Sequence, residues 1–294
     1  MASELHQVAD LLLEHRAGEE DWGEISTLRC ELCPKKIANR FLVCCLLDWQ
    51  MRAGRAWRNG ERLVDEILGD PEDLWREITS IEEDVWKSKF TEYKLHRYPA
   101  GHNRLWSIGK KIRDKYDGDA GRIWRGKESP AVLLDLLALG AGEQISRMIV
   151  GALHDCCQVK DPGDDLSDAD RWLDAQLEAL SKGTIALGEM KRNIRERILE
   201  SYRSGLIASG RIRQVKADVH VCCVLGRVAY GKEMSAPAAT ELARQLNPMD
   251  PWQLDWPLWN VGKDYCTPQN PDCGRCYLAP HCAYNLHRVE ASTA

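Results

Sequence analysis

The sequence predicts an all-α protein. Between Leu5 and Leu153, apolar residues recur at the helical period of about 3.6 residues, and alternation typical of strands is scarce. Glycine and proline breaks separate the periodic stretches, at Gly69-Asp70-Pro71, Pro99-Ala100-Gly101 and Ser129-Pro130. At 294 residues, the chain can bury one large core or two modest ones.

The periodic stretches predict individual helices in chain order. The first four are expected at Ile37–Arg55, Gly60–Leu68, Asn103–Tyr116 and Ala131–Leu139. Gly140-Ala141-Gly142 then predicts a tight turn into a second amphipathic helix that runs to about Ala152. A charged segment follows, in which helices are expected at Ser167–Leu180 and Ile185–Ile207.

Net charge and the length of the apolar stretches exclude some classes of function. The net charge of -5 argues against indiscriminate binding of nucleic acid, although it leaves room for a local basic face. The longest apolar stretch, Phe41–Leu47, is too short to cross a bilayer, and residues 1–13 lack the basic start of a secretory signal. We expect a monomeric cytoplasmic protein without a membrane partner, associated with the nucleoid if the cell is prokaryotic.

Four cysteines near the C-terminus form the strongest functional pattern. They follow the spacing C-x6-C-x2-C-x5-C in a stretch rich in Pro, Asn, Asp and Gly, and they are Cys266, Cys273, Cys276 and Cys282. Thiolates are soft ligands that select iron-sulfur clusters, zinc or cuprous copper. A structural zinc site also uses a C-x2-C pair, and a disulfide framework is a further alternative. Cys30 and Cys33 form a second C-x2-C pair, either unligated thiols or another metal or redox pair.

Two other segments carry candidate chemistry. Backbone amides of the Gly140-Ala141-Gly142 turn and of the following helix N-terminus can hold a DNA phosphate, although a plain helix-to-helix turn has the same pattern. Asp218 precedes an apolar run, which is typical of a helix N-cap, and an active-site carboxylate can stand at the same place.

These motifs together resemble one family. The cysteine spacing resembles the iron-sulfur loop of the endonuclease III and adenine glycosylase family, which implies a [4Fe-4S] cluster held by the four cysteines. The turn resembles the helix-hairpin-helix motif L-P-G-V-G-x-K-T-A of the DNA glycosylase superfamily, where Gly140 and Gly142 match the glycines and Leu139 replaces the proline. Ala217-Asp218-Val219-His220-Val221 resembles the segment V-D-T-H-V, which places Asp218 on the catalytic aspartate.

The resemblance implies a two-lobed helix-hairpin-helix DNA glycosylase fold. Residues 37–157 would form a helical-barrel lobe with the hairpin, and residues 1–36 and 211–294 a cluster lobe. In the family's pattern the aspartate follows the lysine position much more closely than Asp218 follows Gln144, so residues 158–210 would be a charged helical insertion. The sequence gives no role for this insertion.

The resemblance also implies an activity on double-stranded DNA. Gln144 stands where the family has a lysine whose amine attacks the sugar, and a carboxamide cannot form a Schiff base. We therefore expect hydrolytic excision of a modified or mismatched base, with Asp218 and Gln144 as the catalytic pair. A bifunctional glycosylase and lyase would need another amine, such as Lys216, or a natural lysine at position 144. A catalytically silent iron-sulfur DNA-binding protein is the third alternative, and the base excised cannot be read from the sequence. Expected DNA contacts are Gln50, Gly140, Gly142, Lys263 and Arg275.

Overall fold

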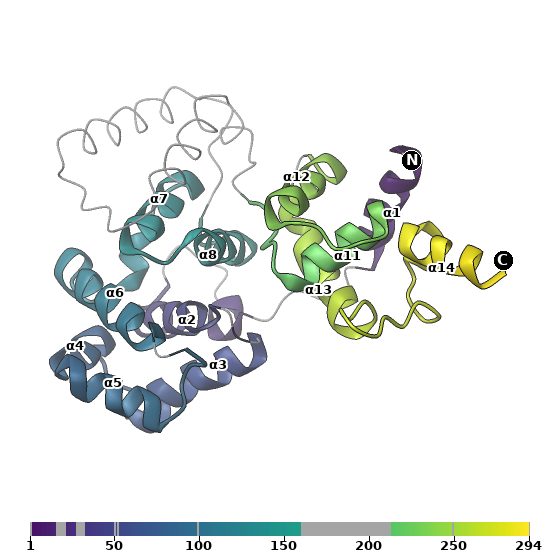
Figure 1. The fold of residues 1–294 in the computed structure, drawn as a ribbon. Helices are drawn as coiled ribbons and strands as arrows, with labels where there is room; N and C mark the ends of the chain where they lie inside the picture. The colour runs from purple at the N-terminus through teal and green to yellow at the C-terminus, as the bar shows by residue number, and fades with distance from the viewer. Residues whose placement is uncertain are drawn as a thin grey trace. The chain divides into compact units, whose positions relative to one another are not determined.

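Helices form the regular structure of this protein (Figure 1). The structure, a computed structural model, describes residues 2–15, 22–27, 33–49, 51, 53–98, 100–159, 213–248 and 250–293. Within these ranges the elements are helical and no β-strand is present, so the predicted all-α class is confirmed.

The chain divides into two units. Asp21–Ala208 form one, here called the central unit, and Met1–Glu20 with Ser209–Ala294 form the other, here called the terminal unit. The 3-10 helix η1 (Gly23–Thr27) contacts α2 (Lys35–Leu47) within the central unit.

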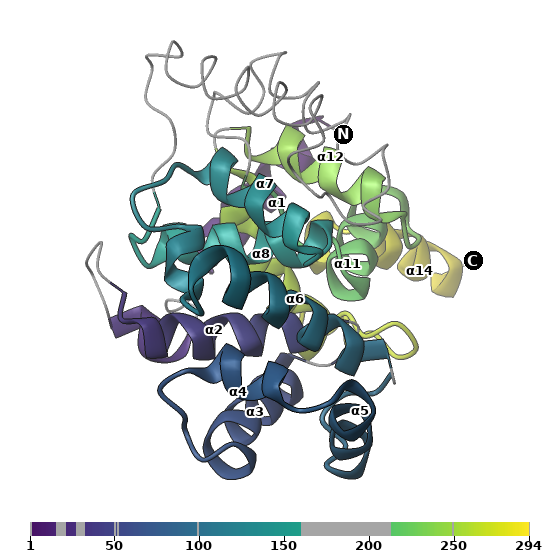
Figure 2. The same cartoon turned by 90° about the vertical axis from the view of Figure 1, so that its left-hand side faces the viewer.

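Helix α2 is the centre of the central unit. Its sequence is apolar on every side from Phe41 to Leu47, and these residues are all buried. It contacts α3 (Ala53–Arg62), α4 (Leu74–Ser80), α6 (Ala100–Tyr116) and α8 (Glu143–Asp155). Figure 2 shows α8 above α2 and α3 below it. The unit is completed by the π-helix η2 (Leu63–Ile67), α5 (Glu83–Glu92), the 3-10 helix η3 (Ala120–Ile123) and α7 (Ser129–Leu139).

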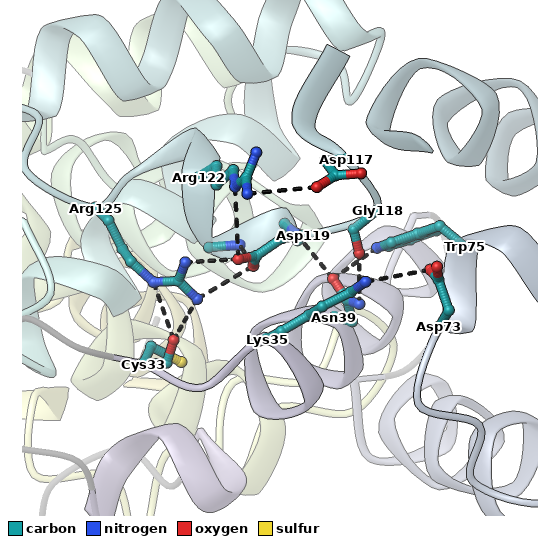
Figure 3. Close-up of polar contacts among 12 residues, drawn as sticks. Cys33, Lys35, Asn39, Asp73, Trp75, Asp117, Gly118, Asp119, Arg122 and Arg125 are labelled. Atoms are coloured by element: carbon teal, nitrogen blue, oxygen red, sulfur yellow. Dashed lines mark hydrogen bonds and ion pairs between the residues drawn. The ribbon is translucent and has the colours of Figure 1, made fainter. Parts of the chain in front are cut away.

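A buried asparagine joins three parts of the central unit (Figure 3). Asn39 of α2 is 1% exposed, and its Oδ1 accepts hydrogen bonds from Trp75 Nε1 and from the Ala120 amide, each at 2.8 Å. Its Nδ2 donates to the Gly118 carbonyl at 2.9 Å. Every polar atom of the side chain's amide group is thus used, so α2, α4 and the turn before η3 are held in one arrangement.

An arginine ties the start of α2 to the same turn. Arg125 Nη1 lies 2.6 Å from Asp119 Oδ2, and its Nε donates to the Cys33 carbonyl at 3.0 Å (Figure 3). Asp119 also accepts from the Gly121 amide at 2.9 Å and so caps η3. These contacts involve the backbone of Cys33, and Cys30 lies outside the described residues.

Helix α11 (Val219–Tyr230) is central to the terminal unit. It packs against α12 (Ala236–Leu246), α13 (Asp255–Asp264) and α14 (Ala283–Thr293), and buries Val221, Val224 and Leu225. The N-terminal helix α1 (Ala2–Glu14) joins this core through Val8, Ala9 and Leu12. Short 3-10 helices η4 (Pro251–Leu254) and η5 (Ala279–His281) contact α1 as well.

Some expected elements differ from the structure. The single helix predicted at Ile37–Arg55 was wrong, because α2 ends at Leu47 and α3 begins at Ala53 and packs back on α2. The helices predicted within residues 167–207 lie outside the described residues. In the parts of the chain that the structure describes, no helix has both the length and the apolar character needed to cross a membrane.

Candidate functional site

The predicted hairpin lies between α7 and α8. Helix α7 ends at Gly140, whose backbone is left-handed (φ 99°). The Gly140 amide donates to the Leu137 carbonyl, and the Ala141 amide donates to the Leu136 carbonyl. Gly142 begins α8 with φ 79°. Both dihedral angles lie in the region that only glycine adopts readily, so the two glycines are required by the backbone of the turn.

Two cations from α6 hold the carbonyl side of this turn. Lys111 Nζ donates to the Leu139 carbonyl at 2.9 Å, and Arg104 Nη2 donates to the Ala141 carbonyl. The Arg104 guanidinium also lies over the Trp49 ring, 5.1 Å from its centroid. Burial lowers the pKa of both Arg104 and Lys111, and neither pairs with a carboxylate among the described residues. Positive charge therefore lies directly behind the turn.

The amide side of the turn suits a small anion. The N-cap of α8 is Gly142, so no side chain caps the first amides of this helix. The positive end of the helix dipole lies at these amides. A β-carbon at residue 142 would lie 2.6 Å from Arg104 Nη2, so a side chain there would displace the end of Arg104. Gln144, in the first turn of α8, is exposed.

Asp218 is the N-cap of α11. Its Oδ1 accepts hydrogen bonds from the backbone amides of His220 at 2.9 Å and Val221 at 3.1 Å. Its Oδ2 makes no hydrogen bond within the described part of the chain, and the side chain is half-buried. The N-cap geometry expected from the sequence is present, and it fixes the carboxylate while leaving one oxygen available. Asp218 belongs to the terminal unit, whereas Gln144 and the hairpin belong to the central unit.

The four cysteines of the C-terminal frame line one hollow. The remaining lining is mostly apolar or aromatic and includes Val224, Tyr265, Leu278 and Tyr284. Within the described residues, no three His, Cys, Asp or Glu side chains converge closely enough to hold a single metal ion. The thiol donor set and the hollow nevertheless fit a compact iron-sulfur cluster surrounded by four cysteines.

Residues of α11 support the first of these cysteines. Cys223 Sγ lies 3.6 Å from the Cys266 carbonyl oxygen, and Arg227 Nη1 lies 3.5 Å from the Cys266 Sγ. The neighbouring Cys223 thiol and the Arg227 guanidinium lower the pKa of Cys266 to about 6, which favours the thiolate that binds metal. Burial raises the pKa of Cys276 to about 11 and also raises that of Cys282. A bound cation would reverse this effect of burial, because metal ligation deprotonates a thiol outright.

Arg227 also orders the chain that follows Cys266. Its Nη1 donates to the Thr267 carbonyl at 2.8 Å and its Nη2 to the Pro268 carbonyl at 2.6 Å. Neither Arg227 nor Cys223 was predicted as a site residue. The available signal for Arg227 was a single arginine within the otherwise apolar stretch of α11, which is a costly burial unless the charge has partners.

The expected DNA contacts of the terminal unit are exposed. Lys263, in the last turn of α13, lies over the Trp259 ring, 5.0 Å from its centroid. Arg275 is 72% exposed, and its Nε donates to Asp272 Oδ2 at 2.6 Å, which offsets part of its charge. Gln50 lies outside the described residues.

A glycine-turned helical hairpin lies in the central unit and a four-cysteine loop lies in the terminal unit. Endonuclease III of Thermotoga maritima is 31% identical to this chain over 72 residues, which are 24% of this chain and 34% of that protein. The chain thus matches about a third of the length of this curated relative, and no protein-family model matches.

The fold is similar over nearly the whole chain. A solved endonuclease III structure, trapped as a covalent intermediate with DNA in an estranged-adenine complex, matches with a TM-score of 0.54 at 15% identity. The match covers 97% of this chain and 98% of that one. The predicted fold is confirmed, because the protein has the fold of the endonuclease III structure, and its sequence resembles an endonuclease III over 72 residues.

Proposed function

We propose that this protein is a DNA glycosylase of base excision repair that acts on double-stranded DNA with a damaged or mismatched base. The observation that carries the proposal is the glycine turn between α7 and α8, built on an endonuclease III fold. Its amide side offers an anion site, and two cations stand behind its carbonyl side. Such a turn holds a phosphate without reading a base, which suits an enzyme that must bind DNA of any sequence.

Asp218 is the proposed catalytic carboxylate. Its carboxylate stabilises positive charge that develops on the sugar as the glycosidic bond breaks, and orients the attacking water. The cap contacts use Oδ1, so Oδ2 is the oxygen assigned to this role. Because Gln144 carries no amine, the reaction ends with an abasic site and an intact strand. Gln50, Gly140, Gly142, Lys263 and Arg275 are the proposed DNA contacts.

The activity is tested with duplexes that carry a panel of modified and mismatched bases. Abasic sites are measured before and after alkali, and we expect strand breaks only after alkali. Breaks without alkali, with an adduct trapped by borohydride, would replace hydrolysis by a lyase reaction through Lys216 or another amine. Binding without base release from any duplex would identify a catalytically silent DNA-binding protein.

We further propose that Cys266, Cys273, Cys276 and Cys282 hold a [4Fe-4S] cluster. The support is the hollow that all four line, together with the soft donor set. When bound, the cluster would stabilise the loop that carries Arg275. The purified protein should be brown and contain about four irons per chain. A colourless protein with one zinc per chain would favour the structural zinc alternative.

A further inference from the structure

A fifth thiol lies behind the proposed cluster ligand Cys266. Cys223 is 1% exposed, and its Sγ lies 3.6 Å from the Cys266 carbonyl oxygen. Within the described chain, the lining of the four-cysteine hollow includes Cys266 and not Cys223. A buried thiol therefore lies beside a residue that lines the hollow.

Helix α11 aims this thiol at the loop. Cys222, the preceding residue, is also buried, but its Sγ points to the Ala217 carbonyl at 3.6 Å. Adjacent residues of a helix point about 100° apart, so only one of the two cysteines can face Cys266. Residues four apart share a face, and Arg227, four residues after Cys223, also reaches Cys266.

The contacts of Arg227 hold the backbone next to residue 266 in place, whichever side chain stands at that position. Arg227 holds the carbonyls of Thr267 and Pro268, and these bonds involve the backbone and not the Cys266 side chain. The Cys266 amide also donates to the Val261 carbonyl at 2.7 Å. Loss of the Cys266 thiol would thus remove a ligand and leave the backbone of residue 266 in place beside Cys223.

We propose that Cys223 is a reserve ligand, which binds the iron at the Cys266 corner when the Cys266 thiol is lost. The inference rests on the proposed [4Fe-4S] site. The Cys223 S–H bond breaks, its proton goes to solvent, and the thiolate forms an iron-sulfur bond at the position that residue 266 leaves open. No electrons are exchanged, so the step needs no oxidant or reductant. Thiolate is the ligand that such iron prefers.

The test uses purified protein without DNA, and measures iron per chain and visible absorbance. Cys266→Ala should retain about four irons, whereas Cys223→Ala/Cys266→Ala should lose them. The matched control is Cys222→Ala/Cys266→Ala, which should retain them because Cys222 faces away. Cys273→Ala should lose its cluster, since no comparable thiol contact is present at that ligand in the described structure.

Several results would overturn the proposal. Three irons per chain in Cys266→Ala, or a loss as complete as in Cys273→Ala, would show that Cys223 does not take over. Retention in the Cys223/Cys266 double variant would assign the role to another donor. Failure of both Cys266→Ala and Cys266→Ser to give soluble protein would also count against it, because a retained cluster would keep the loop folded. A wild-type protein without iron would instead refute the proposed cluster itself.

Discussion

Two substitutions at Asp218 separate its structural role from its chemical role. Asp218→Asn keeps an oxygen that can accept from the amides of His220 and Val221, and asparagine is as good an N-cap as aspartate. Asp218→Ala removes the cap together with the charge. The expected cost in unfolding free energy is therefore a few tenths of a kcal/mol for Asn and about 1 kcal/mol for Ala.

The expected effect on catalysis has a different pattern. Both substitutions remove the carboxylate, so both should slow base release by on the order of 10²-fold or more, about 2.7 kcal/mol in the activation barrier. The rate is measured in single turnovers on the duplex that the base panel selects, and stability by denaturant unfolding. The asparagine variant should lose nearly all its activity while keeping its stability.

A purely structural role of Asp218 predicts a different pattern of rates. If Asp218 were only a helix cap, Asp218→Asn would release the base at close to the wild-type rate, and Asp218→Ala would lose activity only in step with its stability. That outcome would remove Asp218 from the mechanism and leave the proposed activity without a catalytic carboxylate.

Three further substitutions test the central unit. Asn39→Ala should cost about 3 kcal/mol or more in unfolding free energy, because it leaves three buried groups unpaired, whereas Asn59→Ala should cost about 1 kcal/mol. Equal losses in denaturant unfolding would contradict this account. Gly142→Ala should weaken DNA binding alike for all sequences in an anisotropy assay. The control is Gly126→Ala, because Gly126 has a similar φ but no atom near an added β-carbon, and this variant should bind DNA as the wild type does. Gln144→Lys should create an adduct that borohydride traps, absent from the wild type.

The all-α class was predictable because helical periodicity is a local property of the chain. The division of Ile37–Arg55 into two helices was not, since no glycine or proline marks residues 48–52 and the break depends on α3 folding back on α2. Gly60 shows the same limit. The sequence suggested a helix beginning there, but α3 runs through it, and its missing side chain lets α3 approach Cys44 of α2. Tertiary packing decided both cases.

The candidate site divides in the same way. The cysteine frame could be read because its four members lie within one short segment, and a hollow lined by all four is present. The partners of Cys266 could not, because Cys223 and Arg227 reach it across about forty residues, through the packing of α11. The roles of Arg104 and Lys111 behind the hairpin likewise depend on α6 contacting α7.

Helix α11 links the proposed catalytic carboxylate to the residues that contact the cysteine loop, along one rigid element. Asp218 caps its start, and Cys223 and Arg227 lie five and nine residues later on the side that faces the cysteine loop. At 1.5 Å per residue, Asp218 lies about 8 Å from Cys223 and about 14 Å from Arg227 along the axis. Loss of the loop contacts cannot alter the cap hydrogen bonds directly, because both are made within the first turn of α11. Variants of the cysteine loop should therefore weaken DNA binding and stability more than the rate of base release from bound DNA.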